Sequence, residues 1–241
     1  MPRVDQPRNW VLGLFVRAHR GVFSLHPCQR HLAICLNFSF ASSNYNNTGV
    51  EFLQKGDYIT AILYLEQAYF LNKEAETIKK NLAIAYNNYG VSLLKEEKAG
   101  VALEKFNKAR DLFPDDDGFR SNAAKAYNQL AIKALEEKNF VVAENYFYSA
   151  LRLQPDEQAI RKNLSVCLTN YGVEFYDKKQ YTLASQKFID AINFDETNSS
   201  AYAFLGNINY YTQQLQKALI CFEHALQNDP NLDYAKERIE A

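Results

Sequence analysis

Four residues near the start of the chain are of the types that bind zinc. Two histidines and two cysteines fall within ten positions, at His26, Cys28, His31 and Cys35, and imidazole and thiolate groups are the usual ligands of zinc. Their spacing is shorter than the two separated ligand pairs of most structural zinc sites. We therefore interpret the cluster as chance and expect no metal and no other cofactor. Zinc binding is the alternative, and the metal content of the purified protein would decide it.

Signatures of catalysis are absent from the sequence. It contains no glycine-rich phosphate loop, no nucleophile elbow and no pair of histidines at helical spacing. His224 is the one histidine after residue 40, and we expect it at the edge of a helix rather than in a Cys–His couple with Cys221. The run Asp115–Asp117 follows Pro114 and is typical of a helix N-cap. The sequence predicts no catalytic residues and no enzyme activity.

Amide side chains form the most regular polar pattern. They recur at a constant interval in two adjacent rows, which include Asn46, Asn87, Asn128, Asn88, Gln129 and Asn170. An amide donates and accepts hydrogen bonds at once, so such rows could bind an extended peptide backbone. Apolar and aromatic residues lie one or two helical turns further on, at Val91, Leu94, Leu135, Tyr176 and Tyr210. Alternatively, the amides could bond to neighbouring helices and the apolar row could belong to the core.

The elements that carry these rows repeat along the chain. A small residue recurs at the same constant interval, at Gly49, Gly90, Ala131 and Gly172, and then after a shorter interval at Gly206. In each unit an alanine, a large apolar residue and a second alanine follow at fixed positions, as Ala143, Phe147 and Ala150 follow Ala131. Their offsets of three and four residues predict helices, and small residues let two helices cross closely.

This pattern resembles the tetratricopeptide repeat family. Its consensus of an aromatic, Leu-Gly, Ala, Phe and a terminal Pro is followed by Tyr202, Leu205, Gly206, Ala218, Phe222 and Pro230. The resemblance implies an all-α fold, a right-handed solenoid of about five helix pairs in which the first helix of each pair lines an inner, concave groove. It also implies a scaffold that binds proteins.

The spacing departs from the family unit, which has about 34 residues. The interval from Gly172 to Gly206 fits that unit, whereas the three preceding intervals are seven residues longer. The extra residues, such as 117–123, precede the next first helix, and we expect them to lengthen that helix by about two turns. The predicted domains are a leader at 1–43, the solenoid at 42–231 and a capping helix at 232–241. The predicted repeats lie near 42–75, 83–116, 124–157, 165–198 and 199–232.

The charge balance of the chain bears on its class of partner, and the residues of the leader bear on its location in the cell. Lysine and arginine (27) are balanced by aspartate and glutamate (28), so we expect no nucleic-acid partner, and no apolar run is long enough to span a membrane. The stretch Leu32–Ala41 follows the basic Arg30 and precedes Ser42 and Ser43, which is typical of a secretory signal. A periplasmic or secreted protein and a cytoplasmic one both stay open.

Together these features predict a non-enzymatic scaffold or adaptor that holds a protein or an extended peptide in the groove. The alternative is the repeat portion of a larger enzyme, or of an envelope assembly complex, whose active domain lies elsewhere.

Overall fold

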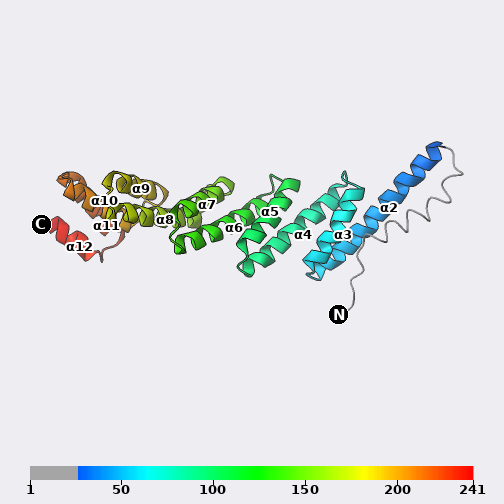
Figure 1. Ribbon diagram of the computed structural model, residues 1–241, viewed down its shortest axis with the longest axis horizontal. Coiled ribbons are helices and arrows are strands. Elements are labelled where there is room, and N and C mark those ends of the chain that lie inside the picture. The colour runs from blue at the N-terminus through cyan, green and yellow to red at the C-terminus, as the bar shows by residue number, and fades with distance from the viewer. Residues whose placement is uncertain (1–26, 241) are drawn as a thin grey trace. The chain divides into compact units, whose positions relative to one another are not determined.

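The computed structural model describes residues 27–240, and the side chains of residues 37–239 apart from Tyr234. These residues form helices without any strand (Figure 1). The first helices of the pairs are α2 (Pro27–Gln54), α4 (Glu76–Lys95), α6 (Asp117–Glu136), α8 (Gln158–Asp177) and α10 (Ser199–Tyr211). The second helices are α3 (Tyr58–Leu71), α5 (Ala99–Leu112), α7 (Phe140–Leu153), α9 (Tyr181–Phe194) and α11 (Leu215–Asn228). The helix α12 (Asp233–Glu240) follows. The expected all-helical fold of five pairs is confirmed.

The chain divides into two compact units, Met1–Tyr86 and Asn87–Ala241, and the division falls within α4. In the first unit α2 packs on α3. In the second unit α6 packs on α7, α8 on α9 and α10 on α11, and successive pairs pack through α5 on α6, α7 on α8 and α9 on α10. The first helices also contact one another directly, α6 with α8 and α8 with α10.

The lengthening of the first helices is confirmed. Helices α4, α6 and α8 have 20 residues each, whereas α10 has 13. All five second helices have 14 residues. The repeat starts predicted at 83, 124 and 165 therefore lie inside α4, α6 and α8, because the extra residues begin the helix instead of forming a loop. Asp116 caps α6, since its side chain accepts a hydrogen bond of 3.0 Å from the Phe119 amide.

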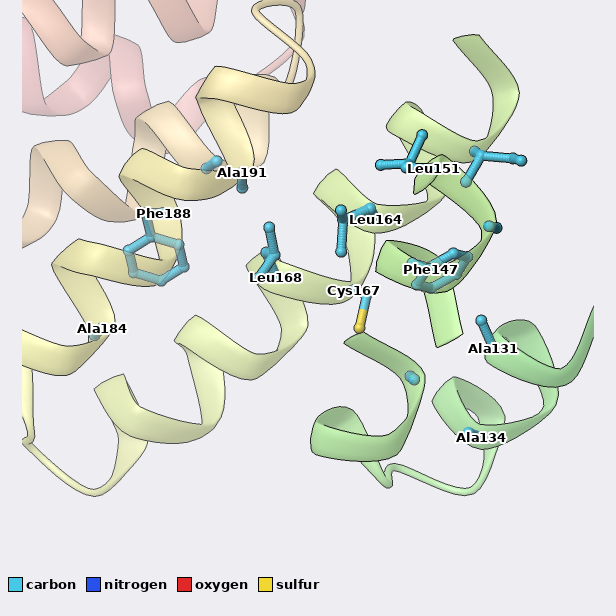
Figure 2. Packing of buried hydrophobic residues seen from close by; sticks show 14 of the residues in the cluster. Ala131, Ala134, Phe147, Leu151, Leu164, Cys167, Leu168, Ala184, Phe188 and Ala191 are labelled. Atoms are coloured by element: carbon cyan, nitrogen blue, oxygen red, sulfur yellow. The ribbon is translucent and has the colours of Figure 1, made fainter. Parts of the chain in front are cut away.

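Small residues face large ones where the helices of a pair cross. A Cβ atom added at Gly172 would lie 2.6 Å from Cε1 of Phe188, and one added at Gly90 would lie 2.6 Å from Cε1 of Phe106. These rings are fully buried. Figure 2 shows the equivalent Phe147 in the core near Ala131, with Leu164 and Cys167 of α8 beside it. The close crossing explains why this position holds glycine or alanine in every pair.

The turn inside each pair has one residue in the left-handed backbone region. It is Gly56 in the first pair, with a φ of 78°. The other four turns use Glu97, Lys138, Lys179 and Gln213, with φ between 57° and 61°. In the fourth turn, the Lys179 amide donates to the Tyr176 carbonyl at 2.8 Å and the Gln180 amide donates to the Phe175 carbonyl at 2.9 Å. This arrangement ends a helix and reverses the chain.

Helix α2 passes through the end of the predicted leader. It runs from Pro27 to Gln54, so the junction of Ser43 and Asn44 lies inside a helix. Residues 1–26, including His26 of the histidine and cysteine cluster that we interpret as chance, lie outside the described residues, and so do the side chains of Cys28, His31 and Cys35. The predicted secretory signal and leader boundary stay predictions.

Candidate functional site

Amides of one first helix bond to amides of the next. The Nδ2 group of the later residue donates to the Oδ1 atom of the earlier one, over 2.8 to 3.0 Å. The pairs are Asn81 with Asn46, Asn122 with Asn87, and Asn163 with Asn128. We call these pairs the amide rungs. Each rung joins positions separated by 35 in the sequence, and each lies within one of the two units.

The last junction replaces the rung by a buried network. Asn198 donates from Nδ2 to the hydroxyl oxygens of Ser165 at 2.7 Å and Thr169 at 2.9 Å. Thr169 stands in α8 where Asn128 stands in α6, three residues before the small residue at the helix crossing. The two hydroxyls donate in turn to the carbonyls of Ala191 and Ser165. Asn198 also caps α10 by accepting from the Ala201 amide at 3.0 Å.

The rungs leave hydrogen-bonding capacity unused. Among the described residues, Nδ2 of Asn128 donates no hydrogen bond and Oδ1 of Asn163 accepts none. Each of these asparagines is half-buried. Gln129 and Asn170, predicted as groove residues, have no side-chain hydrogen bond within the described part, and Asn170 is exposed. Asn88 accepts a long bond of 3.4 Å from its neighbour Asn87.

The apolar residues predicted for the groove are half-buried and contact the core. Val91 and Leu94 pack against the cluster around Phe106, Leu135 and Tyr176 against the cluster around Phe147 and Phe188. Tyr210 packs against a smaller cluster formed by Ala218, Phe222 and Ala235. These side chains therefore support the fold, whatever else they contact.

Besides these half-buried side chains, two exposed apolar residues lie on α6 and α8. Ile132 of α6 is 36% exposed and Val166 of α8 is 49% exposed. They follow the rung residues Asn128 and Asn163 by one helical turn, so they share a side of their helices with the rung. Sequence reasoning did not single out Val166, although its spacing of four residues before Asn170 places the two on one face. We use the name first-helix face for Gln129, Ile132, Val166, Asn170, Val173 and Tyr176.

The thiols and the histidine of the repeats have ordinary structural environments. Burial raises the pKa of Cys167 to about 12, with the nearby Glu144 adding to the shift. Burial also raises the pKa of Cys221, so both thiols stay protonated at neutral pH. His224 is exposed and stacks on Tyr202, with 5.0 Å between ring centres. Within the described side chains, no three His, Cys, Asp or Glu residues gather as metal ligands would.

Among the described residues, no helix is both long enough and apolar enough to cross a membrane.

Comparison with known proteins gives one family match and a set of similar folds. Residues 199–232 match the family model of the tetratricopeptide repeat, and no curated protein sequence matches. Similar solved structures include YrrB, described as a tetratricopeptide protein with an unusual peptide-binding site (18% identity, 82% of this chain and 91% of that chain, TM-score 0.33). MamA is also similar (18% identity, 78% and 96%, TM-score 0.35). So is the first tetratricopeptide domain of Spaghetti (RPAP3), bound to the HSP90 peptide SRMEEVD (17% identity, 50% and 90%, TM-score 0.35).

The matched segment covers α10, α11 and the turn after them. The four preceding pairs repeat its second helix of 14 residues, its two alanines and its left-handed turn residue. The four preceding pairs thus share these positions with the segment that matches the tetratricopeptide repeat model.

Proposed function

We propose that the chain is a non-enzymatic scaffold that holds an extended, uncharged or mildly apolar segment of a partner protein along the first-helix face. The observation that carries this proposal is the pairing of two unbonded amides, Gln129 and Asn170, with two exposed apolar side chains, Ile132 and Val166. Amides can bond to a peptide backbone, and the apolar side chains can contact alternate side chains of the bound segment.

The rung beside this face adds a donor and an acceptor. Asn128 offers its unused Nδ2 group and Asn163 its unused Oδ1 atom, which complement the C=O and N–H of one peptide unit. A protein is favoured over a nucleic acid, because the chain holds 27 basic and 28 acidic residues. A nucleic-acid surface needs an excess of basic side chains to neutralise phosphates.

Photo-crosslinking tests where a partner lies. A photoreactive phenylalanine analogue would be placed at Val166 on the first-helix face, and at Val142 on the second helix α7, which is 36% exposed. We expect one protein to be cross-linked in cells from position 166, through a single extended segment that peptide mapping identifies. Crosslinks obtained only from position 142 would contradict the proposal.

Substitution of the unbonded amides tests how that segment is held. Gln129→Ala with Asn170→Ala removes two amides that take part in no rung, so the melting temperature is expected to stay within a degree or two. Affinity for a synthetic peptide of the mapped segment, measured by calorimetry, is expected to fall about tenfold, since two hydrogen bonds are lost. The matched control is Asn145→Ala with Gln216→Ala, two exposed amides of second helices. An equal loss in the control would refute the role of the face.

A further inference from the structure

Arg238 of α12 lies against tyrosines at the end of α10. Its guanidinium carbon is 4.9 Å from the ring centre of Tyr210 and 5.9 Å from that of Tyr211. Its Nη2 atom is also 3.5 Å from the Tyr211 hydroxyl oxygen. Both ring distances are within the range at which a cation is attracted to the face of an aromatic ring.

Tyr176 of α8 belongs to the same group. Burial raises the pKa of its hydroxyl, the phenols of Tyr211 and Tyr181 raise it further, and Arg238 opposes them. The Tyr176 ring is held in place by edge-on contacts, 5.5 Å from Phe204 and 5.6 Å from Tyr181 between ring centres. Two tyrosines at the end of α10 therefore contact the cation, and Arg238 also acts electrostatically on Tyr176 of the neighbouring first helix.

The preceding junction shows what is unusual about Arg238. Phe204 contacts Tyr176 of the preceding repeat, and Arg238 contacts Tyr210 across the same separation in sequence. Phe204 in addition stacks on the buried Phe188, with 5.4 Å between ring centres. An aromatic core residue at one junction is thus replaced at the next by a cation that lies on ring faces.

The contact of Arg238 is also exchangeable. None of the described ion pairs includes Arg238, so its guanidinium is held by the tyrosines. Helix α12 has eight residues, too few for a stable isolated helix. Its one buried side chain among those described is Ala235, whereas Asp233, Lys236 and Glu237 are exposed. The guanidinium of another arginine could therefore displace Arg238 from the tyrosines at a small cost in free energy.

We infer that Tyr210 and Tyr211 form a binding site for the guanidinium group of an arginine. Arg238 fills this site in the free chain, and an arginine that flanks the uncharged segment of a bound partner takes it over. The inference rests on the proposed function, because Tyr176 belongs to the first-helix face and Tyr210 occupies the same position one repeat later. Arginine is favoured over lysine, since a planar guanidinium stacks on aromatic rings.

The test uses the full chain and N-acetyl-arginine amide as the probe. Binding is followed by NMR of chains with isotope-labelled tyrosine rings. We expect Arg238→Ala to bind the probe at least about tenfold more tightly than the unaltered chain, because the internal competitor is gone. N-acetyl-lysine amide should bind less tightly than the arginine probe, and Tyr210→Leu in the Arg238→Ala background should abolish binding.

Controls keep the test decisive. Arg238→Met retains aliphatic packing without charge, and replaces Arg238→Ala if the latter loses the α12 signals. Equal affinity of the unaltered chain and the variant, or binding that survives Tyr210→Leu, would overturn the inference. Gln129→Ala with Asn170→Ala should leave binding of the probe unchanged. Full segment capture by that variant, together with intact probe binding, refutes the proposed function alone, and absent probe binding by the Arg238→Ala chain with intact segment capture refutes the arginine site alone.

Discussion

Two junctions between first helices solve the same packing problem differently. Between α6 and α8 a half-buried amide pair, Asn163 and Asn128, forms one hydrogen bond of 3.0 Å. Between α8 and α10 the single amide of Asn198 bonds to two hydroxyls, those of Ser165 and Thr169, which are 0% and 5% exposed. The difference follows from the start of the first helix, since α8 has 20 residues and α10 has 13.

The shorter helix gives one residue two tasks. Asn198 is the N-cap of α10 and also the link to α8. Asn163 lies inside α8, five residues after its start at Gln158, so it forms the link without capping. The two extra helical turns therefore separate capping from the contact between repeats, and a substitution at the link should cost more at the last junction.

The largest expected effect is at Asn198. Asn198→Ala should lower the free energy of unfolding by about 2–3 kcal/mol, because it removes the cap and the donor to two buried hydroxyls. Urea denaturation measures the loss, and hydrogen exchange of the α10 amides locates it. Asn198→Gly keeps a good cap residue and should show the cost of the link alone, about 1–2 kcal/mol. A glycine variant as stable as the unaltered chain would show that the hydroxyl contacts contribute nothing.

A smaller effect is expected at the amide rung. Asn163→Ala should lower the free energy of unfolding by about 1 kcal/mol, because water can reach the half-buried Asn128 that loses its donor. Asn145→Ala, at an exposed position inside α7, is the matched control for the higher helix propensity of alanine. The double variant of Asn163 and Asn128 should cost less than the sum of the singles. A cost at Asn163 equal to that at Asn198 would remove the contrast between the junctions.

The contrast also marks the limit of what the sequence predicts. The helix pairs and the lengthened first helices follow from the regular recurrence of small and large residues, because each residue type at a helix crossing has a steric cause. The recurrence of Asn81, Asn122 and Asn163 is visible too. Their bonds to Asn46, Asn87 and Asn128 are not, since such pairing depends on how far neighbouring first helices slide along each other.

At the last junction the sequence signal is weaker still. Asn198 lies one position closer to Gly206 than Asn163 lies to Gly172. Because of this shift by one position, Asn198 does not match the repeat pattern in the sequence. In the structure Asn198 is the N-cap of α10, and from there its side chain still reaches Thr169 of α8. The sequence also does not predict the role of Arg238. Its position in the sequence does not indicate that the last helix would place its guanidinium on the ring of Tyr210.

The smallest effect on stability is expected from glycine substitutions in the turns of the fourth and fifth pairs, and it should be the same in both turns. Lys179 and Gln213 have φ of 58° and 61° in the turns of the fourth and fifth pairs, where a side chain is strained and glycine is not. Lys179→Gly and Gln213→Gly should each raise the free energy of unfolding by about 0.5–1 kcal/mol, measured by urea denaturation. Lys178→Gly is the control, because Lys178 has φ of −79° and gains nothing from glycine. Equal gains in stability from the two substitutions would mean that the fourth and fifth pairs differ only at the start of the first helix. Unequal gains would mean that the two helical turns absent from α10 also change the end of that helix.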